Sequence, residues 1–372
     1  MKQGKKSLVG YREHTVDERA RLLDERAQRA VSEPSFEQKY AVRATGLGPW
    51  PGTQNVDAIH RVRGELGAPH YSYLPALEDR GYAASTLART IATFEELGVD
   101  GASFGWRLHD GYSAEQDTAR ATLDSDINAL ADVIAGATKP QDTFKLQFTG
   151  PLSLTAALHL HNGERSLADR GARRDIRDSW LAGMEHRLHQ IKQAIPAAQL
   201  YVQLDEPSLT DILRGSIPTS SGYRTYQPLD SHEVMETFSI VTQQLSAYGV
   251  KTALNLDAQT IEERYLTFFD AVASVQPAAD ARAWEHLAPR IEHNQEIWLA
   301  AISTLNKPSI IPTLESIYRP WRSIGLPAQR LNQLVLTENG DLTALSPGTA
   351  TDLLAHLTET ATALAEFAQD AD

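Results

Sequence analysis

The strongest chemical signal in the sequence is the segment Tyr201 to Leu209, which reads YVQLDEPSL. A β-prone run ends here in two acids, Asp205 and Glu206, and Pro207 ends the strand. At the C-terminal mouth of a barrel strand such carboxylates face the place where barrel enzymes bind substrate, so both are candidate catalytic residues. D-E-P is also a strand-to-turn transition with an acid that caps the next helix, and the residues alone leave both interpretations open.

The elements that must position these acids alternate along the chain, as expected for parallel βα units. Helical patterns, with apolar residues three and four apart, separate the β-prone runs. We expect helices at 84–97, 115–135, 167–194, 231–247 and 350–368, and strands at 42–48, 99–105, 144–149, 199–205, 250–256, 271–275, 308–313 and 333–337. Eight strands close a (β/α)8 TIM barrel. A doubly wound open sheet is the rival, but no G-x-G-x-x-G segment follows the first strand.

The domain prediction is an N-terminal helical extension over residues 1–40 and a barrel over residues 41–372. Thr15 and Glu18 have the spacing of a capping box before an Arg/Glu-rich helix. The apolar stripe of this helix packs either on its own barrel or on a second copy of the chain. A homodimer formed through the N-terminal helix is therefore one alternative.

Composition narrows the classes of partner. The formal net charge is -13 over 372 residues, which disfavours nucleic acid and anionic membranes, because phosphate binding needs clustered Lys and Arg. No apolar run is long enough to span a bilayer, and the first ten residues lack the apolar stretch of a signal peptide. We expect a cytoplasmic protein with a small-molecule ligand and no membrane partner.

Cysteine and histidine offer no metal-site pattern. The chain has no cysteine, so its own side chains supply no thiolate. None of its twelve histidines forms H-E-x-x-H or a comparable ligand spacing. The pair His186 and His189 is better explained as part of a solvated helix face.

Several segments together resemble the cobalamin-independent methionine synthases, in particular short forms that contain only the catalytic barrel. The matching stretches are ATGLGPWPGT, FTGPLSL, GERSLADRGARRD, YVQLDEPSL followed by IPTSSGY, and LSPGTA, between about residues 44 and 350. The resemblance implies a barrel fold, an amino acid or folate-like ligand, and methyl transfer from a folate or another donor to homocysteine. It also implies a zinc ion, which would hold the homocysteine thiol as a nucleophilic thiolate.

The zinc-ligand positions of that family carry other residues here. Its His-x-Cys pair falls on Asn255 and Asp257, its Glu on Gln276, and its last Cys near Gly340. One carboxylate with neutral amides is a poor zinc shell, so no metal and no cofactor is predicted.

The amino-acid subsite is also changed. The family's Gly-Ser reads Gly48-Pro49, and the acid of the second conserved loop falls near Tyr73. Asp205 keeps the carboxylate that the resemblance assigns to the substrate ammonium group. The predicted substrate-binding residues are Gly48, Tyr73, Asp205, Asn255, Asp257 and Gln276.

Three functions remain open. In the first, the chain transfers methyl groups to a homocysteine-like thiol, and Asp205, Glu206 or Asp257 acts as a general base in place of zinc. Alternatively it is a metal-free enzyme of the same superfamily, as the uroporphyrinogen decarboxylases are, with Arg107 or Arg224 pairing substrate carboxylates. The third alternative is a non-catalytic relative that binds a ligand or a protein.

Overall fold

The computed structural model describes residues 41–111, 113–136, 143–257, 259–276, 284–306 and 308–370. Eight strands form one parallel sheet in the order β1-β10-β9-β8-β7-β6-β5-β2. Their bounds are β1 Arg43–Ala44, β2 Ser72–Tyr73, β5 Thr143–Thr149, β6 Gln199–Asp205, β7 Val250–Asn255, β8 Ala271–Val275, β9 Glu296–Ser303 and β10 Leu334–Asn339. The predicted N-terminal helical extension lies outside the described residues.

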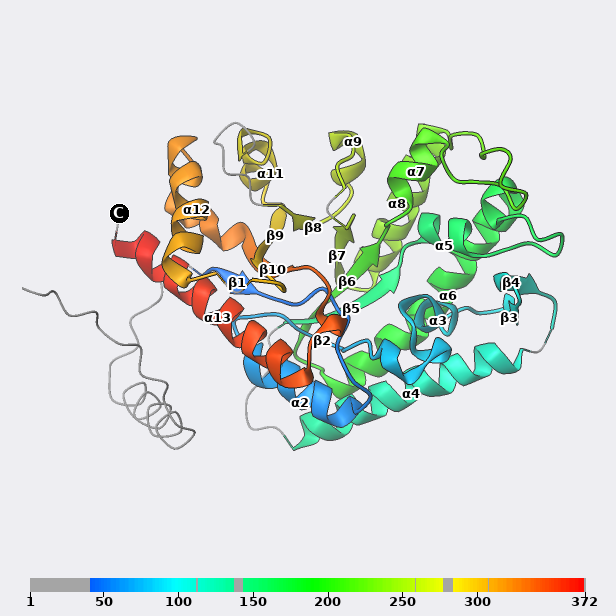
Figure 1. The fold of residues 1–372 in the computed structure, drawn as a ribbon, viewed down its shortest axis with the longest axis horizontal. Coiled ribbons are helices and arrows are strands. Elements are labelled where there is room, and N and C mark those ends of the chain that lie inside the picture. The colour runs from blue at the N-terminus through cyan, green and yellow to red at the C-terminus, as the bar shows by residue number, and fades with distance from the viewer. Residues whose placement is uncertain are drawn as a thin grey trace, which may run out of the picture. The chain divides into compact units, whose positions relative to one another are not determined.

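Backbone hydrogen bonds between the segments of β1 and β2 close the sheet into a barrel. Tyr71 N donates to Ala44 O at 2.9 Å, and Ala76 N donates to Gly48 O at 2.9 Å. The predicted (β/α)8 barrel is confirmed, and Figure 1 shows the strands at the centre with helices around them. The outer helices include α2 Asn55–Glu65, α4 Ala114–Ala135, α6 Arg170–Ala194, α8 Ser231–Ala247, α12 Ile310–Ser323 and α13 Pro347–Asp370.

Two of the eight predicted segments do not form barrel strands. Residues 308–313 begin α12, because Pro312 fits the first turn of a helix and Leu314, Ile317 and Trp321 then recur on one buried face. The seventh barrel strand is β9, whose first residue is the buried Glu296.

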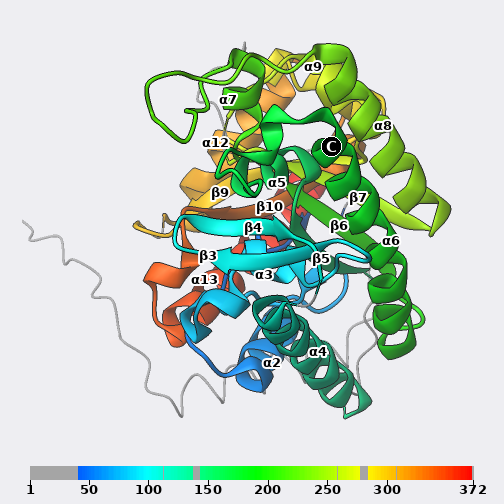
Figure 2. The same ribbon diagram turned by 90° about the vertical axis from the view of Figure 1, so that its right-hand side faces the viewer.

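The second misassigned strand belongs to a hairpin outside the barrel. Strand β3 Gly98–Ala102 pairs antiparallel with β4 Gly105–His109, and Gly105 takes a φ of +126°, which favours glycine. The short β2 occupies the barrel position instead. Figure 1 shows the hairpin to one side of the barrel strands, and in Figure 2, where that side faces the viewer, the hairpin lies in front of them.

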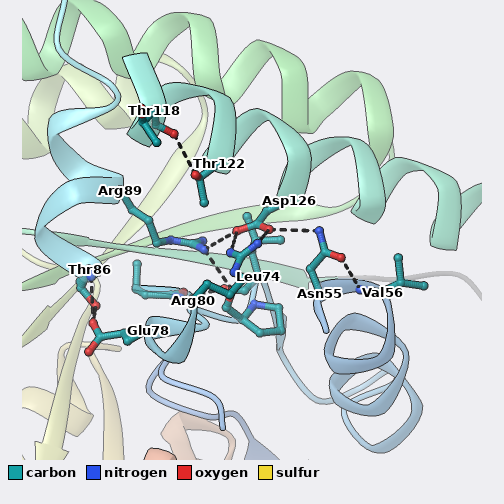
Figure 3. Close-up of polar contacts among 12 residues, drawn as sticks. Asn55, Val56, Leu74, Glu78, Arg80, Thr86, Arg89, Thr118, Thr122 and Asp126 are labelled. Carbon is teal, nitrogen blue, oxygen red and sulfur yellow. Dashed lines mark hydrogen bonds and ion pairs between the residues drawn. The ribbon is translucent and has the colours of Figure 1, made fainter. Parts of the chain in front are cut away.

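A buried charge network fastens α4 to the segment that follows β2. Asp126 accepts two bonds from Arg80, at 2.8 and 2.7 Å, one from Arg89 at 2.9 Å and one from Asn55 at 3.3 Å (Figure 3). Arg89, in α3 Thr86–Ile91, also donates to Pro75 O at 3.1 Å. The network therefore holds the chain just beyond β2, at the seam where the barrel closes.

The interior of the barrel is polar at both ends. Near the start of the strands, Glu296 accepts hydrogen bonds from Tyr71 Oη at 2.8 Å and from Trp298 Nε1 at 3.1 Å. Further along, Lys145 and Gln203 are buried inside the barrel.

No helix in the described ranges combines the length and the apolar character needed to cross a bilayer.

Candidate active site at the barrel mouth

A cavity of about 320 Å³ opens where the barrel strands end. Its wall is formed by residues at and after the ends of β6, β7, β8 and β10, together with Ala300 of β9 and with Leu47 and Pro49 of the loop after β1. This is the end of the barrel at which barrel enzymes carry their active sites. Other cavities, of about 380 and 520 Å³, have walls that come mainly from helices and loops.

Asp205 lies at the centre of the polar wall. Its Oδ1 accepts hydrogen bonds from Gln203 Nε2 at 2.7 Å and from Asn255 Nδ2 at 2.8 Å. Burial raises the pKa of Asp205 to about 6, although both hydrogen bonds favour the charged form. Oδ2 has no protein partner within the described part of the chain, so one carboxylate oxygen is left for a ligand.

Asn255, Asp257 and Gln276 line the same cavity as Asp205, and Gly340 lies in its wall. The barrel therefore brings together residues that are up to 135 positions apart in the sequence. These are the residues onto which the zinc-ligand positions of the methionine synthase family fall. Asn255 Oδ1 accepts from Ser274 Oγ at 2.6 Å and from Asp257 N at 3.1 Å. Gln276 exchanges amide hydrogen bonds with Asn339, at 3.3 and 3.0 Å.

These residues do not fit a zinc ion. The amide oxygens of Asn255 and Gln276 already accept hydrogen bonds, and Gly340 has no side chain, which leaves Asp257 as the one carboxylate among the four threaded positions. Zinc sites use thiolate, imidazole and carboxylate donors in groups of three or four. Across the described ranges, no group of three or more His, Cys, Asp or Glu is arranged to hold a metal.

Two of the predicted substrate-binding residues, Gly48 and Tyr73, pack close against neighbouring side chains and loops. Gly48 has a φ of +129°, and a Cβ there would lie 2.5 Å from the side chain of Gln147, so only glycine fits this loop. Tyr73 is fully buried, and its hydroxyl has no hydrogen-bond partner within the part of the chain that the structure describes. A Cβ on Gly46 would lie 2.6 Å from the Tyr73 ring. Neither Gly48 nor Tyr73 is part of the cavity wall.

Glu206 does not face the cavity, in contrast to the prediction that pairs it with Asp205. Its carboxylate accepts from Leu152 N at 3.0 Å and Ser153 N at 2.6 Å, in the first turn of α5 Pro151–Ala157. Successive side chains at a strand end point in opposite directions, so one acid turns inward and the other toward the helices. A Cβ on Gly150 would lie 2.3 Å from Glu206, which explains the glycine of FTGPLSL.

The two arginines expected to bind substrate carboxylates lie elsewhere. Arg107 is on the β3–β4 hairpin and forms a bidentate pair with Asp100, at 3.0 and 2.6 Å. Arg224 is exposed on the loop after α7 Leu209–Arg214. Among the described residues, no Lys, Arg or His lines the mouth cavity.

Sequence reasoning missed the ionisable groups inside the barrel, Lys145 and Glu338. Lys145 Nζ donates to Gln203 Oε1 at 2.7 Å, so Gln203 joins Lys145 to Asp205. Burial lowers the pKa of Lys145 to about 7, against the opposing effects of Asp205 and Glu338. Burial likewise raises the pKa of Glu338, in the cavity wall, to about 7. In the sequence, the only indication of Glu338 is that an acid directly follows the predicted strand 333–337.

Backbone irregularities gather at this cavity. Asp257 and Ser274, both in its wall, are non-glycine residues with φ of +51° and +57°. The strand register also shifts in β8 between Val272 and Val275, and in β10 between Thr337 and Glu338. Such bulges redirect side chains, and strained backbone is concentrated at functional sites.

Comparison with known proteins shows the fold. No protein-family model matches the sequence. A search of curated proteins gives no match either. Among solved structures, the chain is similar to a B12-independent methionine synthase from Shewanella sp. in complex with selenomethionine. The TM-score is 0.54 at 10% sequence identity, and the match covers 89% of this chain and 99% of that chain.

Two glycoside hydrolases also match, with lower TM-scores. One is a β-mannanase from Alicyclobacillus acidocaldarius, at TM-score 0.39 and 9% identity, covering 90% of this chain and 97% of that chain. The other is a GH26 domain from Prevotella bryantii, at TM-score 0.38 and 8% identity, covering 90% and 93%. At 10% identity, the likeness to the synthase establishes the barrel architecture.

Proposed function

We propose that the mouth cavity binds a small molecule that carries an ammonium group, and that Asp205 is its counter-charge. The observation that carries this proposal is the geometry of Asp205. Two amides hold Oδ1, and Oδ2 remains open to a cavity whose wall contains no cationic side chain among the described residues. A charge-assisted hydrogen bond from an ammonium group is the interaction that this arrangement favours.

The same groups suit proton exchange with a bound amine. A pKa of about 6 for Asp205 and about 7 for Lys145 places both near neutral pH, where a group can give up and take back a proton. Gln203 links the two through hydrogen bonds of 2.7 Å on either side. The proposed class is therefore a metal-free barrel enzyme that acts on an amine.

Methyl transfer to homocysteine is the alternative that follows from the sequence resemblance. A thiol with a pKa near 8.5 is mostly protonated at neutral pH and needs activation. The residues at the family's zinc-ligand positions do not form a zinc site. Asp205 would therefore have to act as the base that deprotonates the thiol. In the methionine synthase of known structure the bound molecule is selenomethionine, an amino acid that also carries an ammonium group.

Calorimetry with alkylamines and amino acids tests the proposal. We expect the wild type to bind an ammonium-bearing ligand, and Asp205→Asn to weaken that binding by at least about tenfold, because it removes a buried counter-charge. Asp117→Asn, on the exposed face of α4, is the control and should bind like the wild type. The affinity should also fall as the pH drops below about 6, where Asp205 becomes protonated.

Three results would contradict the proposal. They are unchanged affinity in Asp205→Asn, binding of none of the amines by the wild type, and stoichiometric zinc in the purified protein together with methylation of homocysteine. The last result would restore the methyltransferase alternative.

A further inference from the structure

Glu338 provides a second carboxylate in the mouth cavity. Its side chain is 1% exposed and lies in the cavity wall. Oε1 accepts from Leu47 N at 2.7 Å, whereas Oε2 is buried and has no hydrogen-bond partner among the described residues. An unpaired carboxylate oxygen in a buried position is costly, so it indicates that a donor from a ligand belongs there.

The strand pairing is irregular next to Glu338. The pairing of β10 with β9 shifts between Thr337 and Glu338, so that Thr337 pairs with Ala300 while Glu338 pairs with Ile302, and Ala301 of β9 is the extra residue. Bulges of this kind commonly lie next to active sites. Burial raises the pKa of the Tyr73 phenol, and the charge of Glu338 adds to this effect. Tyr73 is the position at which the resemblance leads one to expect an acid.

The four carboxylates of the cavity differ in depth. Asp205 and Glu338 belong to its inner part, and Asp257 and Asp341 are exposed at its edge. Asp341 caps a turn through bonds from Thr343, at 2.8 and 2.6 Å, but it still adds negative charge. Lys145 is buried near the cavity but is not part of its wall. The four acids therefore outnumber the one buried cation.

The rest of the wall combines neutral polar side chains with an apolar part. Leu47, Pro49, Ala300 and Leu342 contribute to it. An aliphatic segment would pack against these side chains, whereas a carboxylate on the ligand would meet only acids, neutral amides and the backbone. Like charges placed together in a partly dry site are strongly unfavourable.

We infer that the ligand of this cavity is an aliphatic diamine without a carboxylate, held at its inner ammonium by Asp205 and Glu338 and at its outer ammonium by Asp257. The inference rests on the proposed amine-binding function and makes it specific. It assigns to Glu338 the role of a specificity-determining residue, and it excludes amino acids as the preferred ligands.

The test compares 1,4-diaminobutane, L-ornithine and n-butylamine by isothermal titration calorimetry on the full chain. Ornithine is the same diamine with one added carboxylate, and butylamine lacks the second ammonium group. We expect 1,4-diaminobutane to bind at least about tenfold more tightly than ornithine, because of charge repulsion. It should also bind more tightly than butylamine.

Glu338→Gln keeps the size of the side chain and removes its charge, and it should weaken binding of 1,4-diaminobutane by at least about tenfold. Glu296→Gln is the matched control, a buried interior glutamate at the opposite end of the barrel. It should bind the diamine like the wild type. Circular dichroism establishes that both variants fold, and the control shows what loss of an interior charge does by itself.

The outcomes separate the two proposals. If amines bind but ornithine binds as tightly as the diamine, or butylamine binds as tightly, or Glu338→Gln binds like the wild type, the diamine inference is wrong and the amine-binding proposal stands. If the wild type binds none of the three, the proposed function itself fails, and the inference fails with it.

Discussion

Replacing Asp126 by asparagine should be among the most destabilising single changes in this barrel. Asp126 is 1% exposed and neutralises two guanidinium groups, and the Arg89 side chain is itself only 2% exposed. Without the carboxylate charge, Arg89 keeps Pro75 O as its acceptor, at 3.1 Å, but loses its counter-ion. Breaking a buried ion pair by removing one partner typically costs about 3–5 kcal/mol.

Urea denaturation followed by circular dichroism and tryptophan fluorescence measures this effect. The matched control is Asp117→Asn on the same helix, α4, whose pair with Arg120 is 38–45% exposed. Because exposed pairs contribute little, the control should lose no more than about 0.5 kcal/mol. A loss below about 1 kcal/mol in Asp126→Asn, or a loss equal to that of the control, would refute the account of this network.

Two further predictions concern the site. Asn255→Ala removes one of the two donors that stabilise ionised Asp205, so the pH midpoint of amine binding should rise from about 6, as calorimetry between pH 5 and 8 would show. An unchanged midpoint would mean that Asn255 does not tune Asp205. Gly48→Ala should lower stability by about 1–3 kcal/mol, because the methyl group meets Gln147 and the φ of +129° disfavours alanine. Thermal unfolding measures this, and a neutral effect would show that the loop adapts.

The barrel and its principal acid could be predicted from local patterns. Alternating β-prone and helical segments predict parallel βα units, because each unit carries its own periodicity, and the family resemblance favours the closed barrel over a doubly wound open sheet. Asp205 could be located because a carboxylate after a run such as YVQL cannot remain inside a packed strand. The resemblance then placed Asn255, Asp257 and Gln276 near it, and the barrel brings these residues into one cavity.

Strand assignment failed where local preference and tertiary position disagree. Residues 308–313 are rich in isoleucine, yet the buried face that continues through Trp321 makes them the start of a helix. The actual strand β9 begins with Glu296, a residue that sequence patterns exclude from a core. Its carboxylate is tolerated there because Tyr71 and Trp298 donate hydrogen bonds to it.

The parallel βα units, most of the barrel strands and the acid at the end of β6 could be predicted from local residue patterns. Which side chains enter the cavity depends instead on how the strands pair and pack. Both faces of a barrel strand are buried, one inside the barrel and one under the helices, so alternation does not show which way Lys145 or Glu206 points. The bulge of β9 that lies opposite Glu338 likewise arises from the pairing of two strands and cannot be predicted from the sequence of either strand alone.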